Sequence, residues 1–264
     1  MGKWVRQAQN APGGEKMGAY GAFAEVYDLL MDDFDYPAWA QYYLKLLETA
    51  GVRPKTMAEC ACGTGSMTIP FTEAGIRVTG VDLSGEMLEI AAEKARRAGV
   101  RPMFVCQDMA KLTLPRPVDA LVCACDGVNY LLSDEQVDGF FRAAHRAIRP
   151  GGALAFDVSS EYKLEKVLGN GFFGEERDEV AYLWANAYDP HTRIVQMDLT
   201  FFCREESGLY RRFAETHRQR AHRPEELTAR LREAGFGQIK VFGDRTFEPP
   251  KPDEMRIHFL AVRE

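Results

Sequence analysis

The chain lacks any apolar run of the roughly 18 residues that a membrane-spanning helix requires. Its first residues contain no apolar segment of the kind found in signal peptides, and Arg6 stands where a myristoylation signal needs serine or threonine. The net charge of −6 leaves too little positive charge for a general attraction to nucleic acid. These absences predict a cytoplasmic protein without a membrane partner, and they disfavour nucleic acid as a partner.

Histidine is scarce, and no histidine lies near either of two cysteine pairs with the spacing C-x-C, Cys60 with Cys62 and Cys123 with Cys125. Residues i and i+2 of a strand share one face, so each pair has a spacing that permits metal binding. A buried cysteine, however, behaves as a small hydrophobic residue. We therefore expect reduced cysteines and no metal site.

Residues 1–17 are rich in glutamine, asparagine, proline and glycine without periodicity, and we expect them to form a disordered leader. Residues 18–264 are long enough for one large domain. The apolar spacing of residues 23–31 indicates a first helix, and a second runs from Asp35 to Gly51. Two helices are therefore predicted before the first strand.

Strand and helix patterns then alternate. The predicted strands are Thr56–Cys60, Arg77–Asp82, 102–107, 118–125 and 153–158, and the predicted helices are 66–74, 84–98 and 133–148. Ser84 and Ser133 stand where helix N-caps are expected. Regular alternation of this kind predicts an α/β fold, a doubly wound Rossmann-like parallel sheet with right-handed crossovers.

The pattern changes after residue 160. Three strands are predicted at 179–188, 193–204 and 209–222, separated by turn sequences such as Glu206-Ser207-Gly208. We interpret 160–222 as an inserted antiparallel subdomain that forms a lid or one wall of a substrate pocket. A last helix at 224–234 and strands at 238–243 and Arg256–Arg263 complete the chain.

A glycine turn follows the first predicted strand, where Gly63 and Gly65 allow close approach of the backbone to a ligand. A dinucleotide fingerprint needs a third glycine where this chain has Thr68, so NAD binding is disfavoured. Asp82 ends the second strand, where a carboxylate can accept hydrogen bonds from both ribose hydroxyls. Asp108 ends the third strand and is placed to accept from an adenine amino group, with Met109 beside the ring.

These motifs resemble those of class I S-adenosylmethionine-dependent methyltransferases over residues 18–264. The matching segments are 59–65, 81–84, 107–109, 119–130 and 149–152. The similarity extends to the small-molecule branch that includes bacterial sugar N-methyltransferases and glycine N-methyltransferase. It implies a seven-stranded sheet whose last strand is antiparallel, with S-adenosylmethionine as cofactor and S-adenosylhomocysteine as product.

The resemblance also implies roles for residues. Glu59 and the adjoining loop would hold the methionyl end, Asp82 the ribose and Asp108 the adenine. Ala61 replaces the first glycine of the usual triplet, and we expect a slightly shifted loop that still binds. The predicted cofactor-binding residues are Tyr20, Tyr27, Glu59, Cys60, Ala61, Gly63, Gly65, Asp82, Leu83, Met87, Gln107, Asp108, Met109, Cys125 and Tyr130. For Tyr20 and Tyr27, ordinary helix packing is the alternative.

The reaction site is expected after the fourth strand, because methyl transfer requires the acceptor to be aligned with the sulfonium. Asp126 is the candidate to orient or deprotonate the acceptor, or to steady the cationic cofactor. Asn129 is a second catalytic candidate, with loop capping as the alternative, and Tyr130 offers a further polar group.

The inserted segment is rich in aromatic and basic residues. Most of its aromatic residues are expected to pack, with one or two facing substrate. Arg212, Arg218 and Arg220 would share one face of the last inserted strand. They form either a solvated outer face or a site for a phosphate or carboxylate. His217 and His222 are possible bases.

The sequence therefore predicts a methyltransferase that acts on nitrogen or oxygen of a small molecule, as a monomer or homodimer. An anionic acceptor is one of the alternatives that the sequence leaves open. RNA or protein methylation is the alternative within enzymes. A non-catalytic module that binds S-adenosylmethionine is the alternative from another class.

Overall fold

A computed structural model describes residues 21–32 and 34–264. The predicted leader and Tyr20 lie outside the described residues. Two helices come first, α1 (Gly21–Leu30) and α2 (Tyr36–Glu48), and the Asp35 side chain caps α2 by accepting a hydrogen bond from the N–H of Ala38 at 3.0 Å. No helix among the described residues is long and apolar enough to span a bilayer.

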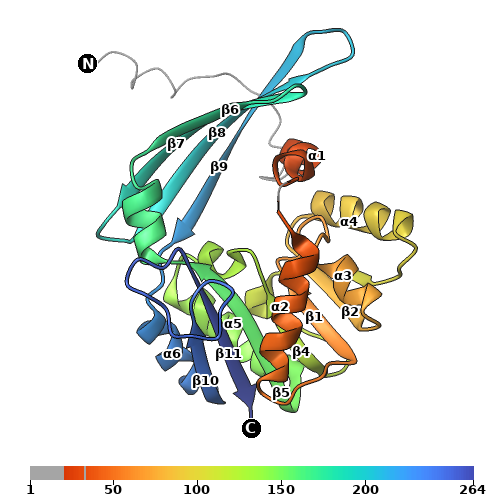
Figure 1. The fold of residues 1–264 in the computed structure, drawn as a ribbon, viewed down its shortest axis with the longest axis vertical. Helices are drawn as coiled ribbons and strands as arrows, with labels where there is room; N and C mark the ends of the chain where they lie inside the picture. Colours follow the sequence, from red (N-terminus) through yellow and green to blue (C-terminus); the bar gives the residue numbers. More distant parts are fainter. Residues whose placement is uncertain (1–20, 33) are drawn as a thin grey trace.

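A seven-stranded sheet forms the centre of the molecule (Figure 1). Its order is β10-β11-β5-β4-β1-β2-β3, and β11 runs antiparallel to both of its neighbours. The strands are β1 (Thr56–Cys60), β2 (Arg77–Asp82), β3 (Met103–Cys106), β4 (Val118–Cys123), β5 (Ile148–Ser159), β10 (Phe236–Phe242) and β11 (Arg256–Arg263). This arrangement confirms the predicted doubly wound sheet with an antiparallel last strand.

Helices cover both faces of this sheet, which explains why β4 and β5 are almost continuously apolar. The α2 helix and α3 (Thr68–Glu73) pack on one face, while α5 (Asp134–Ala147) and α6 (Pro224–Glu233) pack on the other. The α4 helix (Gly85–Arg97) lies beside β2 and β3. The predicted caps are confirmed, because Ser84 and Ser133 accept from backbone N–H groups of α4 and α5.

A second sheet stands between β5 and α6 in the chain, at the carboxyl-end edge of the main sheet (Figure 1). We call it the inserted sheet. Its antiparallel strands are β6 (Phe172–Glu176), β7 (Val180–Asp189), β8 (Ile194–Arg204) and β9 (Tyr210–Arg220). Three of them were predicted. The β6 strand was missed because all five of its residues are exposed, so its sequence carries no alternation.

Alternation gives the inserted sheet an inner and an outer face. Phe201 is buried on the inner face against Leu30, and Val195 is buried against Leu164 of the short helix η3 (Lys163–Leu168). The sequence did not predict η3. Arg212 and Arg218 alternate with the buried positions of β9 and lie exposed on the outer face. The inserted sheet therefore turns an apolar face toward the rest of the molecule.

Candidate active site

The turn after β1 places its backbone in an unusual conformation. Gly63 and Gly65 have φ values of 52° and 74°, in the left-handed region that glycine adopts at low cost. A Cβ at Gly65 would lie 3.0 Å from that of Ala91, so α4 packs directly on the turn. Ala61 takes the place of a glycine and adopts φ 54° as well. The turn therefore keeps the glycine geometry at a position where alanine is strained.

A cavity opens beside this turn. Its lining includes predicted residues from three separate segments: Tyr27, Glu59, Ala61, Gly63 and Cys125. Sequence reasoning missed the other lining residues: Tyr36, Cys62, Thr64, Ser66, Met67 and Ala124.

Tyr36 is the most informative residue of the missed set. Its hydroxyl is buried and lies close to Tyr27 and Ser66, but forms no hydrogen bond of ordinary geometry with the described residues. Burial raises the pKa of this hydroxyl, so it stays a donor near neutral pH. No sequence signal distinguished it from the other aromatic residues of α2. A buried hydroxyl without a hydrogen-bond partner fits a site that a polar ligand completes.

Glu59 supplies a carboxyl group to the cavity wall. It is buried, and it accepts a hydrogen bond from the Thr68 hydroxyl. Burial, with a smaller contribution from the nearby Asp82 carboxylate, raises the pKa of Glu59 to about 8, although the hydrogen bond from Thr68 opposes the shift. Because a neighbouring cation would favour the charged form of this carboxyl, the site is suited to a ligand that brings positive charge.

Asp82 lies at the end of β2, next to the glycine turn. Its oxygens accept from the N–H of Gly63 at 2.8 Å and from the N–H of Ser84 at 3.0 Å. Burial raises the pKa of Asp82, while these backbone donors oppose the shift. Each oxygen retains a lone pair for another donor, as a pair of ribose hydroxyls requires.

The segment after β3 lies beside Asp82, because Cys106 is the register partner of Asp82. Asp108 accepts from the N–H of Ala110 at 2.9 Å with one oxygen, while its other oxygen lies 3.8 Å from the ammonium of the exposed Lys111, a loose pair that leaves room for a ligand donor. The Gln107 amide is bonded in both directions to the backbone of Thr113, so it holds the loop. Met109 is half-buried beside Cys123.

Three further predicted contacts differ in their surroundings. Leu83 is 70% exposed beside Asp82, where its side chain is free to meet a ligand. Cys60 and Met87, in contrast, are buried, and neither lines the cavity. The structure therefore does not bring these two side chains to the cavity wall, because strand and helix periodicity turn them into the core.

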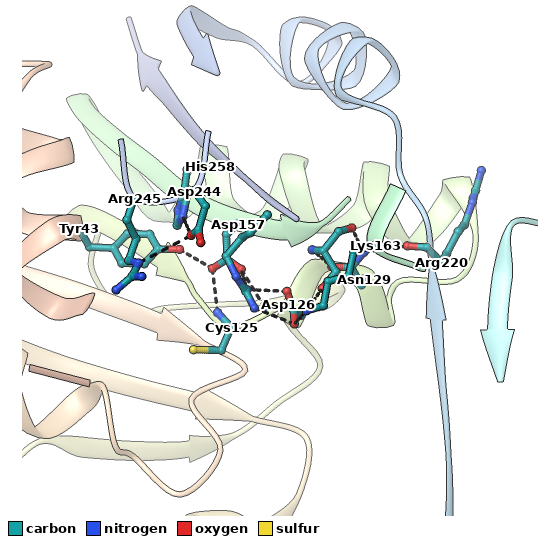
Figure 2. Close-up of polar contacts among 12 residues, drawn as sticks. Tyr43, Cys125, Asp126, Asn129, Asp157, Lys163, Arg220, Asp244, Arg245 and His258 are labelled. Carbon is teal, nitrogen blue, oxygen red and sulfur yellow. Dashed lines mark hydrogen bonds and ion pairs between the residues drawn. The ribbon is translucent and has the colours of Figure 1, made fainter. Parts of the chain in front are cut away.

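The loop after β4 is held by a buried network (Figure 2). Cys125 and Asp126 adopt φ values of 57° and 67°, and their N–H groups donate to Asp157 at 2.8 and 3.1 Å. The hydroxyl of Tyr43 donates to the same carboxylate at 2.5 Å. Arg256 bonds to both Asp157 and Asp126. Asp157 thus fixes a strained loop through two backbone donors.

This network changes the interpretation of Asp126. Its carboxylate lies 2.5 Å from Arg256 and 3.8 Å from Lys163. Although burial alone would raise it, these two cations hold the pKa of Asp126 below its ordinary value. A carboxylate paired in this way is a poor proton acceptor, so the geometry favours a structural role over the expected general base.

The contacts of Asn129 match the loop-capping role that was predicted from the sequence as its alternative. It is fully buried, and its amide donates to the carbonyls of Ser159 and Arg220 at 3.1 and 2.9 Å. Its carbonyl accepts from the N–H of Ser159 at 2.9 Å. These bonds leave no exposed group to contact an acceptor. This geometry favours the loop-capping alternative, and a catalytic role of Asn129 stays a prediction.

Tyr130 joins this loop to the inserted sheet. Its hydroxyl lies 3.4 Å from Nδ1 of His217, and the two rings meet edge to face with centroids 6.1 Å apart. Nε2 of His217 lies 3.9 Å from the carboxylate of Glu215, two residues earlier on the same face of β9. Of the two histidines considered, His217 is therefore beside the candidate site. His222 is buried beside the backbone of Val128 and Leu131, and burial lowers its pKa to about 4 although these backbone contacts oppose the shift.

The basic residues of β9 do not gather at the cavity. Arg212 and Arg218 are exposed on the outer face, where Arg218 bonds to Gln196 at 3.2 Å. Arg220 pairs with Asp134 at 2.7 Å. Arg212 and Arg218 therefore fit the solvated outer face, whereas the Arg220 side chain is only 13% exposed and is held by its ion pair. Within the described ranges, no group of three or more potential ligands of the histidine, cysteine or carboxylate type could hold a metal ion.

Comparison with known proteins gives consistent matches. A family model described as a methyltransferase domain matches residues 57–152. A protein of Geobacillus sp. (strain WCH70), provisionally named a methyltransferase, is 35% identical over 248 residues, covering 92% of this chain and 99% of the relative.

A solved S-adenosylmethionine-dependent methyltransferase from Clostridium acetobutylicum is 31% identical, with a TM-score of 0.83 over 93% of this chain and 99% of that one. An amino-sugar enzyme, dTDP-4-amino-2,3,4,6-tetradeoxy-D-glucose N,N-dimethyltransferase of Saccharopolyspora spinosa, is 27% identical over 136 residues, about half of each chain.

Proposed function

The chain belongs to the class I S-adenosylmethionine-dependent methyltransferases, and on that premise we propose that it methylates a nitrogen or oxygen atom of a small molecule. Its cofactor is S-adenosylmethionine, which supplies an electrophilic methyl group on a sulfonium. The six cysteines are all unbonded to one another, which supports a cytoplasmic location as part of the proposal.

We assign the cofactor's parts to residues around the cavity. Glu59 would balance the positive charge of the methionyl end, and the buried Tyr36 hydroxyl, which lies close to Tyr27 and Ser66, would donate a hydrogen bond there. Asp82 would accept from the ribose hydroxyls, since its two oxygens face the glycine turn and the start of α4. Asp108 would accept from the adenine amino group with the oxygen that pairs only loosely with Lys111, at 3.8 Å. The residues present therefore fit the cofactor.

One observation carries the choice of a small acceptor. Tyr130 and His217 meet across the gap between the loop after β4 and the inner face of the inserted sheet. Because Cys125 of that loop lines the cofactor cavity, we expect the acceptor to lie beside Tyr130, between this loop and the inserted sheet. Such a site favours a small substrate over a macromolecule. We propose that the inserted sheet acts as the lid of this pocket.

The placement of charge supports the same choice. Arg212 and Arg218 lie on the face of β9 opposite His217, so they cannot guide an anionic polymer into the cavity. The name of the similar amino-sugar N,N-dimethyltransferase gives nitrogen as the acceptor of that enzyme, and for this chain we propose nitrogen or oxygen.

The test combines binding and transfer. Calorimetric titration with S-adenosylmethionine, S-adenosylhomocysteine and NAD should give micromolar binding of the two adenosyl ligands alone. Labelled methyl groups should then enter the small-molecule fraction of a Geobacillus extract, and not its protein or RNA fractions. Label in RNA, with activity that falls steeply as salt rises, would replace this proposal by RNA methylation. Cofactor binding without transfer to any fraction would indicate a non-catalytic module.

A further inference from the structure

The contact between Tyr130 and the inserted sheet contains three groups that can pass a proton. The Tyr130 hydroxyl lies 3.4 Å from Nδ1 of His217, and Nε2 of His217 lies 3.9 Å from the Glu215 carboxylate. The first separation is that of a long hydrogen bond, whereas the second is an ion-pair distance beyond hydrogen-bond reach. Catalytic contacts are often long in enzymes before substrate closes the site. The three groups therefore form an ordered row from the loop after β4 into the inserted sheet.

The exposed fractions of the three side chains show which end of the row is open to solvent. Tyr130 is 37% exposed, whereas the side chains of His217 and Glu215 are each 6% exposed. Tyr130 also lies near Tyr27 and close in sequence to Cys125, both of which line the cofactor cavity. The phenolic oxygen is thus the end that an acceptor can reach, and the carboxylate is the end enclosed by protein.

We propose that Tyr130, His217 and Glu215 are a proton relay that deprotonates the methyl acceptor. The inference rests on the proposed function and names the residues that perform its proton transfer. Tyr130 is the catalytic residue, because its oxygen contacts the acceptor. His217 receives the Tyr130 proton at Nδ1, and Glu215 is a positioning residue that orients the opposite N–H of the ring.

The transfer balances without a further reactant. The acceptor atom forms its bond to the methyl carbon as the bond from that carbon to sulfur breaks, and the sulfur keeps the electron pair as a neutral thioether. The acceptor's proton passes to the Tyr130 oxygen while the Tyr130 proton passes to His217. The imidazolium formed is stabilised by the Glu215 carboxylate and later releases its proton to water.

The surroundings of His217 suit this role better than those of Asp126. Burial lowers the pKa of His217, so the ring is uncharged and able to accept a proton near neutral pH. Among residues 21–32 and 34–264, the titratable groups that face it include Glu215 on its own strand and Tyr130 on η2 (Gly127–Tyr130). Asp126, in contrast, is committed to Arg256 and Lys163.

The experiment uses the full chain, labelled S-adenosylmethionine and the protein-free, nucleic-acid-free fraction of a Geobacillus extract as the acceptor source. Initial rates of S-adenosylhomocysteine formation are compared for the wild type, Tyr130→Phe, His217→Asn and Glu215→Gln between pH 5 and 9. Tyr210→Phe and His191→Asn are matched controls, because they make the same changes at exposed sites of the inserted sheet. Thermal unfolding and S-adenosylhomocysteine affinity establish that each variant is folded.

Tyr130→Phe and His217→Asn should lower the rate on the order of 100-fold or more, with S-adenosylhomocysteine affinity within about twofold of the wild type. The wild-type rate should rise with pH as His217 loses its proton. This limb should vanish in His217→Asn and move to lower pH in Glu215→Gln, because loss of the negative charge lowers the pKa of the ring. The controls should keep the wild-type rate.

Two failures are distinguishable. If the wild type forms product and the three variants keep its rate and pH profile, the relay is wrong while the proposed function stands. If the wild type binds S-adenosylmethionine but forms no product above the rate without extract, the small-molecule proposal fails and the relay fails with it.

Discussion

Two neighbouring regions of this protein use buried polar groups in opposite ways. Beneath the loop after β4, Asp157 accepts from Tyr43 and from two backbone N–H groups and pairs with Arg256. In the cofactor cavity, the Tyr36 hydroxyl has no hydrogen bond of ordinary geometry, and Glu59 is held with a pKa of about 8. The first region is satisfied by the protein itself, while the second is completed by a ligand.

The same difference, between polar groups satisfied by the protein and polar groups open to a ligand, is found between neighbouring residues of the loop after β4. Asn129 bonds to three backbone groups and holds the loop, whereas Tyr130 is partly exposed and reaches His217. Asp126 is likewise neutralised by cations, although its position suggested catalysis. Proximity to the reaction site therefore does not identify a functional residue, and the state of its hydrogen bonds is the better guide.

The largest effect on stability should come from removing Asp157, the centre of the network beneath the loop after β4. Asp157→Ala leaves Arg256 buried with less compensation and frees the Tyr43 hydroxyl and two N–H groups. We expect a loss of about 3–5 kcal/mol in the free energy of unfolding, measured by urea denaturation. Asp198→Ala, on the outer face of the inserted sheet, should cost less than about 1 kcal/mol. Equal losses in the two variants would show that the network is not special.

Asp82→Ala tests the region that a ligand completes. Its charged acceptor oxygens should contribute about 1.5–3 kcal/mol to cofactor binding, so S-adenosylmethionine affinity should fall on the order of 10- to 100-fold. Calorimetry measures the loss, with Asp157→Asn as a comparison in which unfolding suffers more than binding. Unchanged affinity in Asp82→Ala would remove it from the ribose site.

Glu59→Gln tests whether Glu59 makes the free energy of unfolding depend on pH. The folded pKa of about 8 lies above the ordinary value of 4.5, so the folded protein binds the extra proton between these values. The contribution of Glu59 to stability is complete below pH 4.5 and is lost as pH rises through 8, with a slope approaching about 1.4 kcal/mol per pH unit. Glu59→Gln should remove this dependence in denaturation series from pH 5 to 9.

The affinity for the cofactor should depend on the ionisation of Glu59 in the opposite direction to the stability. A cationic ligand favours ionised Glu59, so wild-type affinity for S-adenosylmethionine should increase between pH 6.5 and 8. The increase should be absent in Glu59→Gln. A parallel increase in both proteins would assign the pH dependence to another group.

The smallest effect is expected at Ala61. Ala61→Gly relieves a left-handed alanine, but increases the flexibility of the unfolded chain, so the net stabilisation should be roughly 0.5 kcal/mol. Cofactor affinity should stay within about twofold, because the turn already has the glycine geometry. Ala58→Gly within β1 is the control and should destabilise the protein. Destabilisation by Ala61→Gly would show that its methyl group packs.

Much of the fold follows from local sequence. Strand and helix patterns predicted the main sheet, and the short side chains of Ser84 and Ser133 marked helix starts. The exposed β6 strand and η3 had no periodicity to reveal them. For the site, Glu59, Gly63 and Asp82 could be placed at strand ends, because parallel strands deliver their carboxyl ends to one edge.

The sequence by itself determined the sheet, the glycine turn and the acids that end β1, β2 and β3, because each depends on residues a few positions apart. Tertiary structure alone decided that Asp126 is neutralised by Arg256, 130 residues away, and that Asn129 caps a carbonyl 91 residues away. It also brought His217 to Tyr130. The charge and hydrogen bonding of a buried group depend on every segment that surrounds it, and only the folded chain brings those segments together.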